Sequence, residues 1–499
     1  MDLLFSTLTL VTFFPLVGVA VLAFVPAAQK NTARAVAFGT SLITFALSLI
    51  LLTQFHAEDA GFQLVAQAPW FAFGSLAVEY HLGVDGISIL LVLLTTFLVP
   101  IAIASTTHAV EERVKEFMML FLLLEVGMVG VFVALDLVLF YIFWEFTLLP
   151  MLFLIGIWGG ERRTGAAVKF FLYTFAGSIF MLVAILWLGF SAGTFSLPQL
   201  IQQGVAANVQ IWLFFAFALA FAIKVPVWPL HSWLPEAHVE APTAGSVILA
   251  GVLLKLGTYG FVRFNLGLFP QAAVQFAPLF GVLAVIGIVY GAVVSYAQTD
   301  AKKLVAYSSV SHLGFVMLGI FALNPLGLQG AILQMINHGL STGALFLLVG
   351  FIYERRHTRQ LAQFGGLWKV MPLYAALSLI VFFSSAGLPG LNGFVGEFTI
   401  LLGAWEGYGA GWFAGVAALG VILAAVYMLW LFQKMFQGEV THAENKTLPD
   451  LSRREILLLV PLLFFIFWIG LYPKPFFELM APAVEQIVTN LQAAAVALR

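Results

Sequence analysis

The sequence contains no cysteine, and only 9% of its 499 residues are charged. The absence of cysteine excludes disulfides, thiolate-bound iron–sulfur clusters and cysteine zinc sites. Soluble domains carry about 25% charged residues, so this chain lacks the polar side chains that would cover a water-facing surface. This scarcity of charge, with a net charge of −2, excludes an ordinary soluble enzyme, a disordered chain and a nucleic-acid binder.

The chain is instead rich in long apolar stretches. Hydrophobic residues make up 62% of it, 50 residues are Phe, and the mean hydropathy is +1.03. The first apolar stretch has no basic segment before it and is too long for a signal peptide. We therefore predict an all-α polytopic membrane protein. Segments of about 20 apolar residues can cross a bilayer, and fourteen are predicted to do so: 3–25, 33–54, 84–104, 117–135, 137–157, 166–190, 208–230, 243–265, 273–298, 304–323, 328–352, 372–403, 410–436 and 456–472.

The positions of lysine and arginine predict the orientation of these spans. Seventeen of the 22 such residues follow odd-numbered spans, three (among them Arg263) fall on the opposite side, and two lie within spans. By the positive-inside rule, the odd-numbered loops are cytoplasmic and both termini lie outside. The longest outer loop runs from about 55 to 83. The tail at 475–499 has apolar residues at helical spacing, so we expect it to lie along the outer surface.

Several ionisable side chains fall inside the predicted spans. An unpaired charge at the bilayer centre costs about 2.5–3.5 kcal/mol on insertion scales, so these groups must pair, face the protein interior or meet internal water. Carboxylates that change the charge of a nearby lysine, together with histidines, are what lateral proton transfer requires. Lys224 is expected about one and a half turns inside its span, and the others near mid-span: Glu125, Glu145, Lys255, His312, His338 and Glu397.

Each of these residues also has a structural interpretation. The charges can form buried pairs that only hold helices together, and a membrane histidine is often an interhelical hydrogen-bonding group. For His312 and His338 both interpretations stay open. Asp85 and Asp136 lie at span ends, where helix capping is the better interpretation.

Two of the spans contain helix breakers. Pro226 and Pro229 follow Lys224, and the run Gly387–Gly390 with Pro389 precedes Glu397. Proline interrupts a helix because it lacks an N–H and clashes one turn back. Paired interrupted helices are typical of transporter repeats. We therefore predict two inverted five-helix repeats, 117–265 and 273–436, with isolated proline kinks as the alternative.

The stretch from Lys224 to Thr243, KVPVWPLHSWLPEAHVEAPT, resembles the signature of the antiporter-like subunits of respiratory complex I, in the Mrp antiporter superfamily. The resemblance extends over essentially the whole chain. Five further segments agree with it: Gly83–Gly86, Trp144–Glu145, Leu254–Gly260, Tyr307–His312 and Gly393–Phe398.

This resemblance implies a proton-translocating membrane-arm subunit of an NADH–quinone oxidoreductase, driven by quinone reduction in partner subunits. It implies that Glu145 pairs with Lys224, that Lys255 is the central lysine, and that Glu397 is the terminal exchange residue. His312 and His338 match histidines of the central axis, whereas Glu125 matches no family position. The glutamate at 397 and the short tail set the chain apart from the sister chains N and L.

No cofactor or metal is expected in this chain itself; the resemblance places NADH, FMN, iron–sulfur clusters and quinone in partner subunits. The implied partners are the antiporter-like chains L and N, small K-, J- and A-type subunits, the redox arm and the lipid bilayer of a bacterial inner membrane, with both termini periplasmic. The alternatives are an Mrp-type Na⁺/H⁺ antiporter subunit and the corresponding chain of photosynthetic NDH-1 or a membrane-bound hydrogenase. A quinone-binding subunit and a purely architectural spacer are less favoured.

Overall fold

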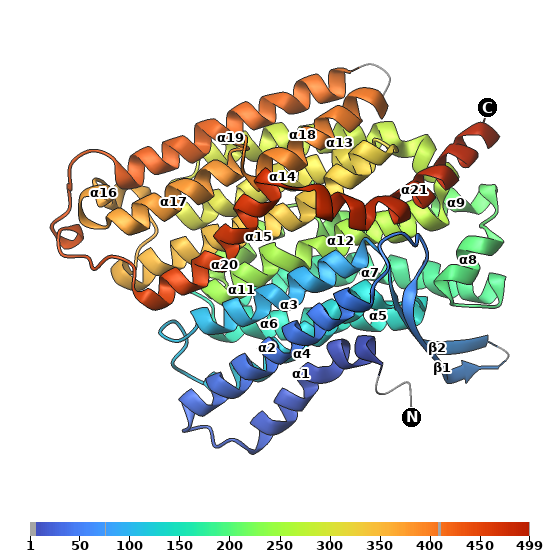
Figure 1. Cartoon of the computed structure of the whole chain (residues 1–499), viewed down its shortest axis with the longest axis horizontal. Coiled ribbons are helices and arrows are strands. Elements are labelled where there is room, and N and C mark those ends of the chain that lie inside the picture. Colours follow the sequence, from blue (N-terminus) through green and yellow to red (C-terminus); the bar gives the residue numbers. More distant parts are fainter. Residues whose placement is uncertain (1–5, 75, 408–410, 499) are drawn as a thin grey trace. The chain divides into compact units, whose positions relative to one another are not determined.

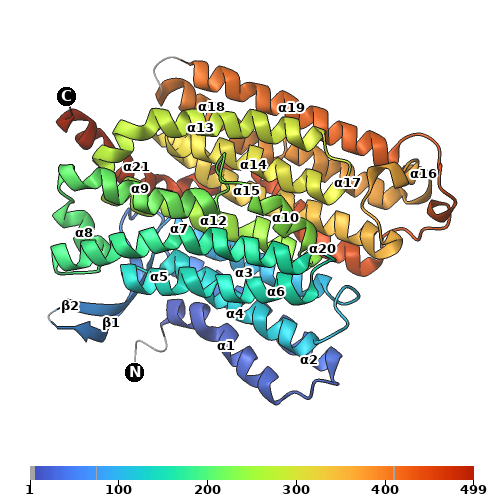
Figure 2. The same cartoon turned by 180° about the vertical axis from the view of Figure 1, so that it is seen from behind.

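The computed structural model describes residues 6–74, 76–407 and 411–498. Figures 1 and 2 show a predominantly helical chain with one two-stranded sheet. Thirteen helical segments are long and apolar enough to cross a membrane. The remaining predicted span, 372–403, consists of two shorter helices, α17 (Pro372–Ser385) and α18 (Asn392–Gly407). The predicted fold class, a polytopic helical membrane protein, is confirmed.

The chain folds into two compact units. The first unit contains residues 1–225, 252–277 and 478–499. Within it, α4 packs against its neighbours α1, α2, α3, α5 and α6. The elements that lie wholly in this unit are α1 (Thr7–Phe24), α2 (Lys30–Gln54), β1 (Gln63–Phe73), β2 (Leu76–Val84), α3 (Ser88–Ser105), α4 (Val114–Val133), α5 (Leu137–Phe146), α6 (Leu148–Trp158), α7 (Arg163–Ala192), α8 (Leu197–Gln203), α9 (Ala207–Lys224), α12 (Leu254–Gly260) and the π-helix η2 (Phe261–Leu266).

The second unit contains residues 226–251 and 278–477. Its core is α15, which packs against α14, α17, α18 and α20. Besides α17 and α18, this unit holds α10 (Trp233–Glu240), α11 (Thr243–Ile248), α14 (Ala301–Ile320), α15 (Pro325–Arg356), η3 (Leu361–Gln363), α16 (Leu367–Val370), α19 (Trp412–Phe436), η4 (Ala443–Asn445) and α20 (Arg453–Leu471). Three elements continue from one unit into the other: the π-helix η1 (Leu249–Leu253), α13 (Pro270–Tyr296) and α21 (Lys474–Ala497). The inverted repeats at 117–265 and 273–436 stay a prediction.

The segment treated above as the longest outer loop is a β-hairpin. Strands β1 and β2 pair antiparallel, with Ala66 opposite Leu82 and Ala72 opposite Ala77. The hairpin leads directly into α3, where the Asp85 carboxylate accepts hydrogen bonds from the backbone N–H groups of Ile87 and Ser88 at 3.1 and 2.9 Å. The capping role predicted for Asp85 is therefore confirmed.

Asp136 separates α4 from α5, as its position between two apolar runs predicts. Its carboxylate caps α5 by accepting from the N–H groups of Val138 and Leu139 at 2.9 and 3.1 Å. The predicted span 137–157 is confirmed by the membrane-length segment Leu137–Trp158, in which Thr147 separates α5, ending at Phe146, from α6, beginning at Leu148. The break follows from Pro150, whose ring clashes with the carbonyl of Phe146 four residues earlier.

The C-terminal tail forms the amphipathic helix α21. Its buried residues recur every three or four positions and so form one stripe: Met480, Ala483, Val484, Val488, Leu491 and Ala494. Beside this stripe, the backbone of Leu479 and Met480 packs against Gly86. A Cβ atom at position 86 would overlap the carbonyl oxygen of Leu479. The location of the tail on the outer surface remains a prediction.

Candidate functional site

Lys224 is the last residue of α9. The expectation that it lies one and a half turns inside its helix is wrong, because Pro226 and the following residues end the helix at once. Its side chain is 1% exposed. The ammonium nitrogen lies 5.3 Å from the Trp144 ring centre and 5.7 Å from that of Phe170, distances at which aromatic rings attract a cation. It has no hydrogen-bond partner among the described residues.

Glu145 lies two residues before the break between α5 and α6. Its carboxylate interacts electrostatically with Lys224 and forms hydrogen bonds with Ser178 and Tyr141. The Oε1 atom has no hydrogen-bond partner within the described parts of the chain. The structure thus brings Glu145 and Lys224 together as charge partners without a direct hydrogen bond between them.

Lys255 is fully buried in α12, between the π-helical turns η1 and η2. Isolated π-helical turns occur frequently at functional sites. Helix α12 approaches the end of α9 closely at Gly257, where a Cβ would lie 2.9 Å from the Phe221 carbonyl oxygen and 3.0 Å from the Lys224 Cβ. Glycine at this position therefore lets the Lys255 helix pack directly against the end of the Lys224 helix.

A buried ion pair lies further along the same helical segment. Arg263, assigned above to a charge on the outer side, is only 5% exposed, and its Nη2 lies 2.6 Å from Oδ2 of Asp85. Its Nε donates to the Tyr259 hydroxyl at 3.2 Å, and that hydroxyl donates to the carbonyl of Phe132 at 3.0 Å. This pair fixes the end of the hairpin against η2, and the sequence pattern did not reveal it.

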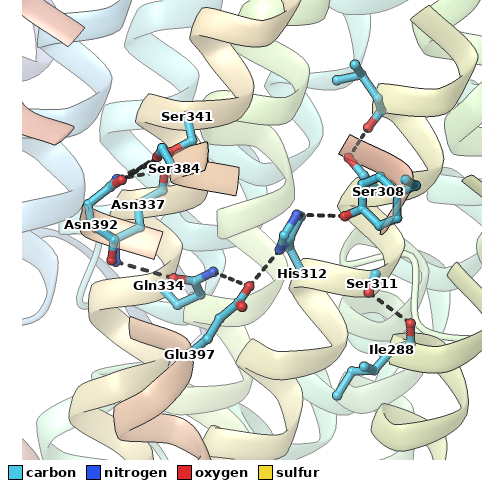
Figure 3. Close-up of polar contacts among 12 residues, drawn as sticks. Ile288, Ser308, Ser311, His312, Gln334, Asn337, Ser341, Ser384, Asn392 and Glu397 are labelled. Atoms are coloured by element: carbon cyan, nitrogen blue, oxygen red, sulfur yellow. Dashed lines mark hydrogen bonds and ion pairs between the residues drawn. The ribbon is translucent and has the colours of Figure 1, made fainter. Parts of the chain in front are cut away.

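In the second unit, the close-up in Figure 3 shows His312 of α14 beside Glu397 of α18. The His312 Nδ1 lies 2.7 Å from Glu397 Oε1, and both side chains are buried. Gln334 of α15 donates its Nε2–H to the same oxygen at 3.0 Å, and the Tyr427 hydroxyl lies 3.2 Å from His312 Nε2. Neither Gln334 nor Tyr427 was a sequence candidate.

These contacts define one consistent arrangement of protons. When Glu397 is ionised, it only accepts, so the proton between the two groups lies on Nδ1 of His312. Neutral His312 then accepts the Tyr427 O–H at Nε2. Glu397 Oε2 has no hydrogen-bond partner among the described residues, which leaves it open to a second proton or to water. The pair can therefore exchange a proton across one short contact.

The polar network continues to the break between α17 and α18 (Figure 3). Asn337 donates to the Gln334 side-chain oxygen at 3.3 Å and to the Asn392 carbonyl at 2.8 Å. The Asn392 side-chain oxygen accepts from the Ser384 hydroxyl at 2.6 Å, and that hydroxyl lies 2.7 Å from the hydroxyl of Ser341. Side chains therefore satisfy polar groups at this interrupted helix.

A small cavity adjoins the network and has room for about one water molecule. His338 lines it, as do both His312 and Glu397. The His338 ring centre lies 5.9 Å from the His312 ring centre. The second unit thus gathers three of the candidate residues, whereas Glu145, Lys224 and Lys255 belong to the first unit.

Glu125 is the seventh of the ionisable groups predicted inside spans; Glu145 is half-buried and the other six are buried. Glu125 lies in the middle of α4 with no exposed surface, and neither carboxylate oxygen has a hydrogen-bond partner in the described chain. Across the described ranges, no group of three or more His, Asp or Glu side chains is arranged to hold a metal ion.

Comparisons with known proteins give a consistent result. Residues 134–426 match the family described as NADH:quinone oxidoreductase/Mrp antiporter, TM. The chain is 48% identical to NADH-quinone oxidoreductase subunit M of Rhodobacter capsulatus, over 98% of this chain and 97% of that protein. A chain of respiratory complex I from Thermus thermophilus with bound NADH is 35% identical, with a TM-score of 0.88 over 97% of this chain and 99% of that one. A chain of the Mrp complex from Dietzia sp. shares the fold, at 22% identity and a TM-score of 0.84 over 97% of this chain and 99% of that chain.

Proposed function

The chain belongs to the NADH:quinone oxidoreductase/Mrp antiporter family of membrane proteins, and we propose that it moves protons along a buried series of Lys, Glu and His side chains. It is a multi-pass, antiporter-like subunit of a proton-translocating NADH–quinone oxidoreductase and is similar to subunit M over nearly its whole length. The series consists of Glu145, Lys224, Lys255, His312, His338 and Glu397.

The surroundings of the chain are also part of the proposal. The neighbours are antiporter-like chains L and N, small membrane subunits and a redox arm that holds FMN, iron–sulfur clusters and the sites for NADH and quinone. The membrane is a bacterial inner membrane with both termini on the periplasmic side, because most Lys and Arg residues follow odd-numbered spans. Energy reaches this chain from quinone reduction in those partners.

One observation carries the proposal: the 2.7 Å contact between His312 and Glu397, buried and flanked by hydrogen-bond donors on both sides. A hydrogen bond that only held the two helices together would not require two ionisable side chains. Imidazole and carboxyl groups can each hold or release a proton, so one proton can pass between them across this contact. Glu397 then releases it through its unpartnered Oε2.

In the first unit, Lys224 takes up a proton and Glu145 stabilises the resulting ammonium ion. When Glu145 is ionised and close, charged Lys224 is favoured; when the two separate, burial favours neutral Lys224 and the proton leaves. Lys255 receives it and hands it on towards His312, His338 and Glu397. The Trp144 and Phe170 rings hold the Lys224 ammonium group while excluding water.

Two substitutions test this switch: Glu145→Gln and Lys224→Ala. Each is expected to abolish NADH-driven proton uptake in inverted membrane vesicles, while electrophoresis of the intact complex shows normal assembly. Exposed Lys303 provides the matched control, and Lys303→Ala should pump like the parent. Normal pumping by either assembled site variant would refute the switch.

A further inference from the structure

Glu125 is a buried carboxyl that the proposed path does not use. A carboxylate without a partner is costly in a membrane protein, and burial of an uncompensated charge is relieved by binding a proton. No hydrogen bond reaches either oxygen within the described chain, and the side chain has no exposed surface. In this arrangement the group is therefore a neutral carboxylic acid.

The charged groups of the neighbouring elements do not compensate Glu125. Helices α1 and α3 carry no Asp, Glu, Lys, Arg or His, and neither does α6. The ionisable residues on α2, α5, α12 and β2 form no hydrogen bond with it: Lys30, Arg34, Glu145, Lys255, Glu79 and His81. Glu125 is thus not hydrogen-bonded to the Glu145–Lys224 pair.

The face of α4 that carries Glu125 adjoins both the N-terminal helices and α12. Phe132, seven residues further and so on the same face, has its ring centre 5.3 Å from that of Tyr259 in α12. Gly127 and Gly130 contact the other side, against Thr147 and Phe143 around the end of α5. Two residues correspond to about 200° of helical rotation, so Glu125 lies opposite Gly127 and on the same side as Leu122. Leu122 reaches Gly18 of α1, which also meets the Thr40 hydroxyl of α2.

This contact fixes the depth of Glu125 relative to α2. Helices α2 and α4 run in the same direction because one span separates them. At about 1.5 Å per residue, Glu125 lies about 4.5 Å beyond Leu122 and Thr44 about 6 Å beyond Thr40, so the two share a level. One turn further along α2, the Ser48 and Thr96 hydroxyls lie 2.8 Å apart. All of these hydroxyl-bearing residues are buried.

Proline supplies acceptors in the next turns beyond Glu125. Pro15 of α1 is three residues from Gly18, and Pro100 of α3 is four residues from Thr96; both lie inside their helices and are buried. Each proline leaves the carbonyl four residues earlier without its helical donor. At about 1.5 Å per residue, these carbonyls lie about 6–8 Å beyond the level of Glu125, near the Ser48 and Thr96 hydroxyls.

We propose that Glu125 is a second proton-binding site, which exchanges its proton through the hydroxyls of Thr44, Ser48 and Thr96 during turnover. One proton moves from the carboxyl oxygen to a hydroxyl oxygen while that hydroxyl passes its own proton on, and no electrons move. The two sites communicate through α4, because Gly127 rests on Thr147, two residues beyond Glu145. The exchange step rests on the proposed translocation; the proton on Glu125 does not.

The first test is infrared difference spectroscopy of the intact complex, parent minus Glu125→Gln. The expected result is loss of one C=O stretching band of a protonated carboxylic acid, a band that persists in Glu116→Gln. Glu116 is the matched control, on the same helix but partly exposed and paired with Arg113. Persistence of the full band intensity in Glu125→Gln would overturn the proposal, since Glu125 would then be ionised.

The second test measures protons taken up per NADH oxidised. Glu125→Gln is expected to lower this ratio and Glu125→Asp to restore part of it; the parental ratio in Glu125→Gln overturns the exchange step. If Glu125→Gln fails to assemble, Thr44→Val is used instead. A shifted carboxyl band and slower deuterium exchange of that band are then expected. An unchanged band would refute the path. Normal pumping by Glu145→Gln together with a lost Glu125 band would refute the proposed switch but not this site.

Discussion

Tyr427→Phe tests whether the His312–Glu397 contact works as a proton-transfer pair. The substitution removes one oxygen atom, the hydroxyl that lies 3.2 Å from Nε2 of His312. Ring packing is retained, because phenylalanine fills nearly the same volume. Without this hydroxyl, Nε2 has no hydrogen-bond partner among the described residues in either tautomer. The ring orientation that places Nδ1 2.7 Å from Glu397 Oε1 therefore loses one of its two hydrogen bonds and becomes less stable.

The magnitude follows from the cost of the lost bond. A neutral hydrogen bond contributes about 1 kcal/mol, and leaving a buried acceptor unpaired costs about 1–3 kcal/mol. Each kcal/mol is about a fivefold change in an equilibrium. The equilibrium constant that favours the ring orientation donating to Glu397 should therefore fall about fivefold or more, and NADH-driven proton uptake should slow.

The assay compares proton uptake with NADH oxidation in the same vesicles. Tyr374→Phe is the matched control: Tyr374 is buried in the same unit and its hydroxyl donates to the Leu348 carbonyl at 3.0 Å, away from the pair. Both variants lose one buried hydroxyl, so both should lose similar stability, but only Tyr427→Phe should lose pumping. Equal pumping by the two variants would refute the assigned role of His312.

Three further predictions concern the first unit. Gly257→Val should push α12 away from the Phe221 carbonyl at an overpacking cost of about 1–3 kcal/mol, and it should slow proton uptake more than it lowers assembly. Asp85→Asn leaves Arg263 buried without its counter-ion, which costs about 3–5 kcal/mol; a lower thermal midpoint of the detergent-solubilised complex would show it, and an unchanged midpoint would contradict it. Burial lowers the pKa of the His81 imidazole, against a smaller opposing effect of Glu79. Hairpin stability that is fully present above pH about 6.5 should therefore be lost progressively as the pH falls below that value through the lowered pKa of His81. Corrected hydrogen-exchange rates of the hairpin amides should rise over that range in the parent but not in His81→Phe.

The spans and the two main helix breaks were predictable because their causes are local. Apolar length identifies a span without any knowledge of its neighbours, and the breaks after Lys224 and before Glu397 follow from proline and glycine. The break at Thr147 has the same cause, Pro150, but a single proline in a strongly apolar run gave no reason to divide the span. The hairpin at Gln63–Val84 was missed because it lies between two predicted spans, where a loop was the simpler interpretation.

The candidate site was only partly predictable. A sequence shows which charged residues would be costly to bury, but it does not show which residues form hydrogen bonds with them. Lys224 and Glu397 stand out because a buried charge is expensive in a membrane. Gln334 and Tyr427 are tolerated in many apolar helices, so nothing marked them before the fold placed them on either side of the His312–Glu397 contact. The prediction that Arg263 is an outer-side charge was wrong for a related reason. A charged residue near the end of a span is normally assigned to a loop, and the sequence did not reveal its ion-pair partner, Asp85.

The helix breaks and the buried charges also explain each other. The carbonyls at a helix C-terminus carry a partial negative charge, and a cation there gains about 0.3–2 kcal/mol depending on burial. Lys224 occupies the last position of α9, so the prolines that end the helix also place its ammonium group at this favourable end. Glu397 lies in the second turn of α18, closer to the positive N-terminal end than to the other end, although the effect weakens beyond the first turn. Because burying each charge costs about 2.5–3.5 kcal/mol, the helix end and the aromatic rings around Lys224 offset a large part of that cost without a fixed ion pair. A charge held this way remains free to gain or lose a proton, which a tight ion pair would prevent.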